Sequence, residues 1–318
     1  MKHEKSSTLF LCLTVFFTLC VAIAGCKKDD DNNSHLPPSS TIADIVSAEP
    51  SFTTLKTAVI KAGLATTLSG TGPFTVFAPD NDAFNASGIS ADAIGNLPDS
   101  VVKKIILYHT IIAKIPASRV PAGPNAAVLA ASGDSVYVTS NSNGVFVNGI
   151  KVKQADVMAS NGLVHVLSSV LMPPPGNIVQ IAQADTTFSY LVAAVLRAST
   201  GSTNVAAVLS GKAPFTVFAP TNNAFRAAGF ATVNDINAAD PNALTTILTY
   251  HVLSGRVFSS DLTEGAKPVT VNGNKLSISL SGGATVKGNS NAVAAKIKPA
   301  NIVATNGVIH VIDAVLLP

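Results

Sequence analysis

The hydrophobic pattern of this chain has a helical part followed by a strand-rich part, and the arrangement occurs twice. Apolar residues recur at intervals of three and four between residues 42 and 60 and again between residues 178 and 196, the spacing of helices that pack one face on a core. Downstream, short apolar segments alternate with Gly, Asn and Ser turns, which is typical of strands. We expect strands at residues 135–139, 145–147, 150–152, 270–271, 276–280 and 285–286.

Two Asn-Gly pairs lie among these segments. Asn148-Gly149 and Asn272-Gly273 favour the positive φ angles of a tight hairpin turn, so we expect antiparallel hairpins there. Each half ends in a continuously apolar segment, residues 164–171 and 308–317, which predicts a central strand. Helices followed by antiparallel strands indicate the α+β class.

Three sequence phrases recur in the same order. GPFTVFAP followed by DNDAF at residues 72–84 returns as APFTVFAP and TNNAF at residues 213–225. A Tyr-His pair at 108–109 returns at 250–251, and NGLVHV at 161–166 returns as NGVIHV at 306–311. The spacing is 141 residues for the first phrase, far longer than the ~20–50 residues of a solenoid unit, so each copy should have its own core.

These phrases, in this order and spacing, resemble the signature of the fasciclin domain family. The resemblance covers residues 41–318 and implies an α+β fold of two tandem fasciclin-like domains, each a bent mixed β-sandwich with packed helices. We place domain 1 at residues 41–174 and domain 2 at residues 177–318, joined by the three prolines at 173–175, which favour a short, semi-rigid connection. The resemblance also implies adhesion or extracellular binding, not an enzyme.

The first phrase contains a strand that leads into a helix. Asp80 and Thr221 stand where a helix N-cap is expected, and Phe84 and Phe225 fall on the inner face of the first turn. The residue types here are those of a core, so the simplest role of the motif is to anchor the sandwich.

The fasciclin resemblance also implies candidate binding residues, because the Asn-Asp-Ala-Phe and Tyr-His segments are implicated in integrin-type adhesion. The corresponding residues are Asn81, Asp82, Ala83, Phe84, Tyr108 and His109 in domain 1, and Asn222, Asn223, Ala224, Phe225, Tyr250 and His251 in domain 2. Domain 2 has Asn223 where domain 1 has Asp82, so it lacks the carboxylate that would engage a partner's metal. Domain 1 is therefore the expected binding domain, with the Tyr-His pairs half-buried.

Four of the six histidines occupy repeated positions, which raises the question of a metal site. Each domain has only two of them, without H-x-x-x-H spacing, whereas a closed zinc site needs three or four ligands. We expect no metal and no cofactor. His165 and His310 lie inside apolar strands, and we expect both to be buried, hydrogen-bonded and structural.

The first forty residues determine the protein's location. Lys2 and Lys5 precede an apolar run of residues 9–24, and Ile23-Ala24-Gly25-Cys26 resembles a bacterial lipobox. We expect residues 1–25 to be a lipoprotein signal peptide and Cys26 to carry the lipid that binds the membrane. The alternative is a transmembrane anchor, but the run is shorter than the ~20 residues that span a bilayer.

Residues 26–40 are rich in charged, Pro and Ser residues and should form a flexible, lipidated tether. Lys28, Asp29 and Asp30 resemble the export signal of Bacteroidetes lipoproteins, which favours a surface-exposed outer-membrane lipoprotein over a periplasmic one. The alternative is an ordinary solvated linker.

Cysteine content and charge restrict the function further. Cys12 and Cys20 lie in the removed segment, so Cys26 is the only mature cysteine and no intrachain disulfide forms. The formal net charge of +3 has no basic block, which argues against nucleic acid. There is no G-x-S-x-G elbow and no Gly-rich phosphate loop, so we expect no enzyme.

A glycan ligand is the main alternative to a protein ligand, in an accessory lipoprotein of a polysaccharide uptake system. Sugar-stacking sites prefer exposed aromatic rings, and this chain has no Trp and only 4 Tyr. A glycan site would have to use the polar loops at residues 141–144 and 288–291, which are also ordinary turn sequences.

Overall fold

The computed structural model describes residues 39–123, 125–212 and 214–318. The proposed signal peptide, Cys26 and most of the tether lie outside the described residues. Within the described part, every sheet takes its strands from one repeat only.

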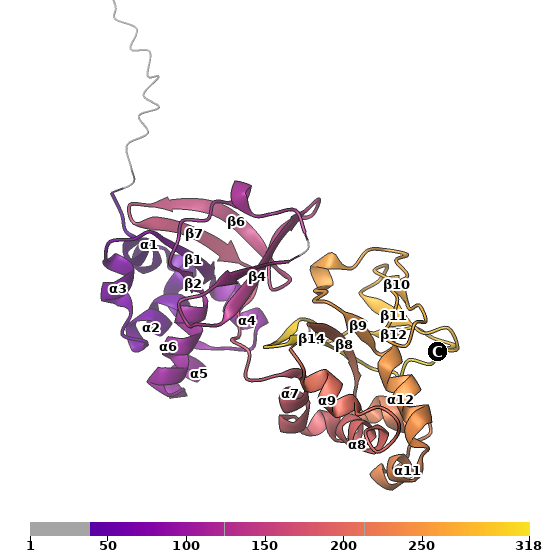
Figure 1. Ribbon diagram of the computed structural model, residues 1–318. Coiled ribbons are helices and arrows are strands. Elements are labelled where there is room, and N and C mark those ends of the chain that lie inside the picture. The colour runs from indigo at the N-terminus through magenta and orange to yellow at the C-terminus, as the bar shows by residue number, and fades with distance from the viewer. Residues whose placement is uncertain (1–38, 124, 213) are drawn as a thin grey trace, which may run out of the picture. The chain divides into compact units, whose positions relative to one another are not determined.

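Domain 1 begins with helices and ends with strands, as the hydrophobic pattern predicts (Figure 1). Its helices are α1 (Ile42–Ala48), α2 (Thr53–Lys61), α3 (Ala65–Ser69), α4 (Asn81–Ala86), α5 (Ala91–Asn96) and α6 (Asp99–Tyr108). Its strands are β1 (Phe74–Pro79), β2 (Thr110–Ile111), β3 (Ala126–Leu129), β4 (Ser135–Asn141), β5 (Gly144–Val147), β6 (Ile150–Ala159) and β7 (Gly162–Leu167).

Domain 2 repeats this order. Its helices are α7 (Ile178–Ala184), α8 (Ser189–Ala198), α9 (Val205–Ser210), α10 (Asn222–Ala227), α11 (Val233–Ala238) and α12 (Pro241–Tyr250). Its strands are β8 (Phe215–Pro220), β9 (Val252–Ser254), β10 (Ser277–Ser279), β11 (Thr285–Lys287), β12 (Ala295–Lys296), β13 (Ile302–Ala304) and β14 (Gly307–Ile312). Short 3-10 turns complete the two sets: Pro50–Phe52, Ala117–Arg119, Thr186–Phe188 and Ser259–Asp261.

The first helix of each repeat starts at a matching cap. Thr41 accepts a hydrogen bond from the Asp44 N–H while Asp44 accepts from the Thr41 N–H, and Asn177 forms the same capping box with Gln180. These reciprocal bonds satisfy N–H groups that have no partner within the helix.

The sheets are mixed, in agreement with the fold that the fasciclin resemblance implies. Domain 1 has one sheet in the order β2-β1-β7-β6-β5-β4-β3, with β1 and β7 parallel. Domain 2 has a sheet in the order β13-β14-β8-β9, with β8 and β14 parallel, and a separate sheet β10-β11-β12. The long segment between β1 and β7, which contains helices α4 to α6 and strands β2 to β6, lets the chain return in the same direction.

Strand β1 is buried on both faces, and its alternating side chains enter two hydrophobic clusters. Val76 and Ala78 contact the helical cluster, whereas Phe77 packs with Tyr108 and Leu167 on the other side. Domain 2 is built the same way around β8. The predicted central position of the last strand is confirmed, since β7 lies between β1 and β6 and β14 between β13 and β8.

Two details differ from the predictions. Residues 270–271 are not a strand, because the Thr270 N–H donates to the Asn274 carbonyl and closes a tight turn. The last strands also end early, at Leu167 and Ile312 instead of residues 171 and 317. Beyond these ends, the N–H groups of Val170, Leu171 and Leu316 donate to side chains instead of to a neighbouring strand. The Asn148-Gly149 turn is as predicted, with φ of 51° and 74° at the two residues.

Among the described residues, no helix has both the length and the apolar character needed to cross a bilayer.

Candidate functional site

The strand-to-helix junction of each repeat is organised by its capping residue. Asp80 Oδ1 accepts from the Ala83 N–H at 2.8 Å, and Thr221 Oγ1 accepts from the Ala224 N–H at 3.3 Å, so both predicted N-caps are confirmed. Asp80 also forms an ion pair with Lys153. The predicted burial of Phe84 and Phe225 is also observed.

The first asparagine of each junction fastens the new helix to the start of α2 in domain 1 and of α8 in domain 2, and to the 3-10 turn before it. Asn81 Oδ1 accepts from the Thr54 N–H at 3.1 Å, and its Nδ2 donates to the Pro50 carbonyl at 3.0 Å. Asn222 makes the matching bonds to the Tyr190 N–H, at 3.0 Å, and to the Thr186 carbonyl, at 2.9 Å. The amides of both asparagines are thus engaged within the domain.

The second residue of each of these helices has an exposed side chain, unlike the asparagine before it. Asp82 occupies this place in domain 1 and Asn223 in domain 2, where the Asn223 Oδ1 accepts from Arg226. Of the candidate binding residues, these two present the most accessible polar groups.

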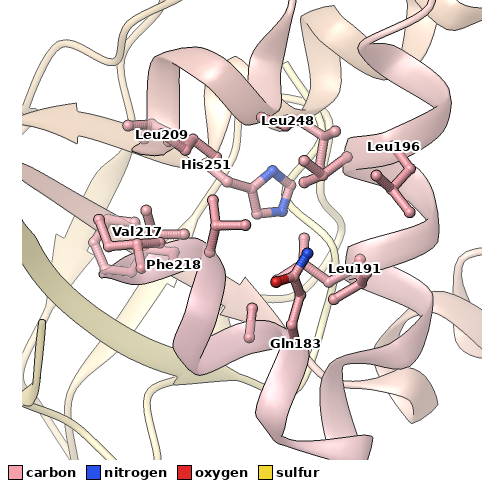
Figure 2. A pocket seen from close by; sticks show the side chains of 15 residues that line it. Gln183, Leu191, Leu196, Leu209, Val217, Phe218, Leu248 and His251 are labelled. Atoms are coloured by element: carbon pink, nitrogen blue, oxygen red, sulfur yellow. The ribbon is translucent and has the colours of Figure 1, made fainter. Parts of the chain in front are cut away.

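The histidines of the Tyr-His pairs are buried rather than half-buried. His109 is 1% exposed and His251 is 2% exposed. Figure 2 shows His251 surrounded by apolar side chains, among them Leu191 and Leu248. A partner cannot reach either ring in the folded domain.

The hydrogen bonds of these two rings determine their tautomer. His109 Nε2 accepts from the Leu171 N–H at 2.9 Å, so Nδ1 carries the proton and donates to the Ile105 carbonyl at 2.8 Å. His251 makes the same bonds, to the Leu316 N–H and the Ile247 carbonyl, each at 2.8 Å. Burial lowers the pKa of both histidines to about 4, so both are neutral near pH 7.

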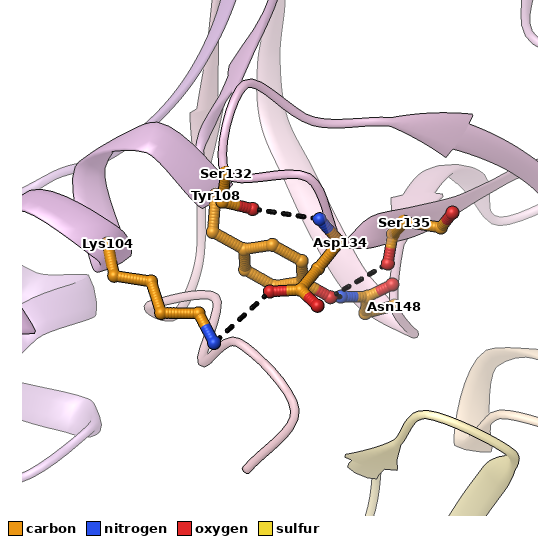
Figure 3. A network of polar contacts seen from close by, with 6 residues as sticks. All are labelled: Lys104, Tyr108, Ser132, Asp134, Ser135 and Asn148. Carbon is orange, nitrogen blue, oxygen red and sulfur yellow. Dashed lines mark hydrogen bonds and ion pairs between the residues drawn. The ribbon is translucent and has the colours of Figure 1, made fainter. Parts of the chain in front are cut away.

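The tyrosine hydroxyls are also hydrogen-bonded within their own domains, as Figure 3 shows for Tyr108. The Tyr108 hydroxyl donates to the Ser135 carbonyl and accepts from Asn148 Nδ2, both at 3.0 Å. The Tyr250 hydroxyl donates to the Lys275 carbonyl at 2.7 Å and accepts from the Asn289 N–H at 3.0 Å. Burial raises the pKa of the Tyr108 phenol, so this hydroxyl keeps its proton. Each Tyr-His pair therefore ties the end of a helix to the strand-rich part and to the C-terminal segment of its repeat.

His165 and His310 are buried and bonded to backbone, as predicted. His165 Nδ1 accepts from the Asp156 N–H at 3.1 Å, and Nε2 lies 2.9 Å from the Ile115 carbonyl. His310 makes the corresponding contacts, to the Asn301 N–H at 3.3 Å and the Val257 carbonyl at 2.8 Å. Their rings stack on Phe77 and Phe218.

The N–H groups that these rings accept from belong to residues with left-handed backbone. Asp156 has φ of 57° and Asn301 has φ of 64°. A side-chain acceptor is needed there because this conformation turns the N–H away from the carbonyl groups of the neighbouring strand. The role of each histidine remains a prediction, and the geometry supports a structural one.

For one further repeated residue, an asparagine, no role could be predicted from the sequence. Asn161 Oδ1 accepts from the Ile42 N–H at 2.9 Å, and Nδ2 donates to the carbonyls of Leu68 and Gly70, both at 2.8 Å. Asn306 makes the same three bonds in domain 2, to Ile178, Leu209 and Gly211. The sequence signal that could have indicated this role is the asparagine-glycine pair that opens both copies of the third phrase.

The polar loops considered for glycans are held by turn bonds. Asn141 Oδ1 accepts from the Asn143 N–H at 2.8 Å. Asn291 Oδ1 accepts from the Gly288 and Leu317 N–H groups, and its Nδ2 donates to the Val315 carbonyl. Within the described part of the chain, no group of three or more His, Cys, Asp or Glu side chains could hold a metal.

Comparisons with known proteins find the same domain twice in this chain. The model of the fasciclin domain matches residues 50–173 and 187–318. The transforming growth factor-beta-induced protein ig-h3 of Sus scrofa is 29% identical over 255 residues, which are 79% of this chain and 35% of that protein. Human periostin is 28% identical over 265 residues, 79% of this chain and 29% of that protein. The chain thus spans about a third of these relatives.

A shorter bacterial relative matches roughly one repeat. Protein sll1483 of Synechocystis is 40% identical over 136 residues, 42% of this chain and 74% of that protein. Among solved structures, a FAS1 domain pair from the insect cell adhesion molecule fasciclin I covers 82% of this chain and 95% of its own, at 20% identity and a TM-score of 0.39.

Proposed function

The chain belongs to the fasciclin domain family, and we propose that it is a surface-exposed outer-membrane lipoprotein that mediates adhesion through two tandem domains, residues 41–174 and 177–318. The observation that carries this proposal is that the repeated motifs contain both buried structural side chains and an exposed polar one. Their aromatic and histidine side chains hold the domain together, while Asp82 stands exposed on a helix whose start is rigidly capped.

The arrangement favours binding over turnover. In the described residues, both ring nitrogens of each repeated histidine lie within hydrogen-bonding distance of backbone groups, which leaves none of these rings ready to move a proton. Many copies on one cell would add their weak contacts into firm attachment.

The adhesion proposal is tested with cells that carry the chain or its variants on a protein-coated and a glycan-coated surface. Asp82→Asn makes domain 1 resemble domain 2, and we expect it to reduce attachment several-fold while leaving the fold unchanged. Asn223→Asp is the matched control in domain 2 and should not reduce attachment. If loss of the whole chain leaves attachment unchanged, the adhesion proposal is wrong; attachment to the glycan surface alone would favour the glycan alternative.

The membrane location is tested separately. Cys26→Ala should prevent lipid attachment, so the protein should no longer be recovered with the outer membrane. Replacing Lys28, Asp29 and Asp30 by Ala should preserve lipidation but protect the protein from protease added outside the cells. Equal protease sensitivity of both forms would contradict surface export.

A further inference from the structure

Five asparagines of this chain are followed directly by a glycine, at positions 143, 148, 161, 272 and 306. In such a pair the peptide nitrogen of the glycine can attack the side-chain amide carbon of the asparagine, because glycine has no Cβ to hinder the approach. The attack also needs an asparagine side chain that is free to rotate toward the next residue. The fold therefore decides which of the five pairs can react.

Three of these side chains are fixed by hydrogen bonds inside their domains. Asn148 is 2% exposed, and its amide accepts from the Tyr137 N–H at 2.8 Å and donates to the Tyr108 hydroxyl at 3.0 Å. Asn161 and Asn306 each use both ends of the amide in three bonds to backbone groups. Each of the three would have to break these bonds before its Cγ could approach the glycine nitrogen.

Asn272 of domain 2 is half-buried and is bonded to its own turn. Its Oδ1 accepts from the Thr270 hydroxyl at 2.7 Å and from the Asn274 N–H at 2.9 Å, and its Nδ2 donates to the Thr246 carbonyl at 3.2 Å. The N–H of Gly273, whose nitrogen would have to attack, donates to the Thr270 carbonyl at 2.9 Å. Both reacting groups of this pair are thus engaged.

Asn143, at the tip of the hairpin between β4 and β5, has a free side chain. The residue is exposed, and within the described part of the chain its side-chain amide makes no hydrogen bond. The bond that joins it to Asn141 Oδ1 comes from its backbone N–H. An exposed loop tip is also where a chain moves most readily. This side chain can therefore rotate toward the next residue without breaking a contact.

The attacking nitrogen at this tip belongs to Gly144. Gly144 pairs with Asn141 in the last rung of the β4-β5 ladder, directly before the turn. The end of an exposed hairpin opens more easily than the interior of a sheet, because few buried contacts hold it. Opening of this one rung frees the Gly144 nitrogen while the rest of the sheet stays paired.

We infer that Asn143 is a site of spontaneous deamidation in the folded protein. The Gly144 nitrogen forms a bond to Cγ of Asn143, the side-chain amide leaves as ammonia together with the proton of that nitrogen, and a succinimide ring results. Water then adds to one of the two ring carbonyls and opens the ring, which leaves either an aspartate or an isoaspartate. Water is the only other reactant.

The product changes the charge of domain 1 at one exposed point. The neutral amide becomes a carboxylate close to Lys151, whose Cε lies 3.7 Å from the place that a Cβ on Gly144 would take. The new negative charge thus forms beside a positive one at an exposed position, so the fold should tolerate it. Both Asn-Gly pairs of domain 2 are hydrogen-bonded, so only domain 1 should acquire this charge with time.

The first test follows the purified protein at pH 8 by proteolytic peptide mapping, with an isoaspartyl methyltransferase assay to recognise the isoaspartate. We expect Asn143 to be converted at least about tenfold faster than each of the other four asparagines, because those react only from a locally opened state. The rate should fall at pH 6, because the attacking nitrogen must lose its proton. Conversion of Asn143 no faster than that of the other four, or equally fast at both pH values, would overturn the inference.

Two controls separate the effect of the fold from that of the neighbouring residues. In urea, where the structure is lost, all five pairs should react at similar rates, and an undiminished lead of Asn143 would overturn the inference. Thr270→Val removes the hydroxyl that holds Asn272, so Asn272 should react several-fold faster in this variant. An unchanged rate at Asn272 would overturn the assignment of the selectivity to these hydrogen bonds.

Discussion

The two fasciclin domains share one set of internal hydrogen bonds, made by the repeated cap, asparagine, tyrosine and histidine residues, which we call the frame. They differ in the β-sheet that surrounds this frame. In domain 1 strand β6 is continuous and joins β5 to β7, so seven strands form one sheet. In domain 2 the corresponding stretch is divided into β12 and β13, and the strands separate into sheets of three and four. One bridge, between Ile297 and Ile312, marks where the two sheets would have joined.

A proline lies in the stretch that is divided. Asp156 and Asn301 occupy equivalent places, since each donates its N–H to the repeated histidine, and the residues two positions earlier are Gln154 and Pro299. Gln154 lies in the ladder opposite Val166, whereas Pro299 has no N–H to donate. The histidine contact survives this change, which shows that the frame does not depend on a continuous outer sheet.

Acid should destabilise both copies strongly, because both contain a neutral, buried Tyr-His histidine. The pKa of His109 and of His251 is lowered from 6.5 to about 4 by burial, so between these values the unfolded chain binds protons that the folded chain does not. Stability is therefore complete above about pH 6.5 and falls as the pH falls toward 4, by about 3 kcal/mol for each histidine.

Urea denaturation at pH 7.5 and 4.5 measures the total loss, and hydrogen exchange at Leu171 and Leu316, which donate to the two rings, assigns it to each copy. Burial also lowers the pKa of His310, which should add to the acid sensitivity of domain 2. A pH-independent unfolding free energy would contradict the neutral state of the rings.

The local parts of this frame could be predicted from sequence, and the long-range parts could not. Asp80 and Thr221 are recognisable as caps, and Asn148-Gly149 as a turn, because the groups they bond lie within a few residues. The burial of Tyr108 depends on a carbonyl at Ser135 and an amide at Asn148, contacts that only the assembled sheet provides.

The same limit applies to the asparagine before the last strand. Asn161 stands in the repeated phrase, but its partners lie as far away as Ile42, so its role could not be predicted from the residues around it.

Removing this asparagine should have nearly the same effect in both copies. Asn161→Ala and Asn306→Ala each leave one N–H and two carbonyls without their side-chain partner, at a cost of about 3 kcal/mol. Urea denaturation of the two variants gives the values. Asn143→Ala, in an exposed turn, is the control and should change the unfolding free energy by less than about 0.5 kcal/mol. A large difference between the two copies would mean that their frames are not equivalent.

The smallest expected effect concerns a charge contact found at the junction of domain 1. Lys153 pairs with Asp80, and the equivalent residues of domain 2 are Lys298 and the uncharged Thr221. Because the Lys153 side chain is 40% exposed, the pair is partly screened, and Lys153→Ala should cost about 0.5 kcal/mol. Lys298→Ala is the matched control and should cost less. High salt should remove the difference between the two variants. An equal loss of unfolding free energy in both variants, unchanged by salt, would contradict this prediction. It would show that the lysines stabilise by packing of their carbon chains and that the charge of the cap residue makes no difference between the domains.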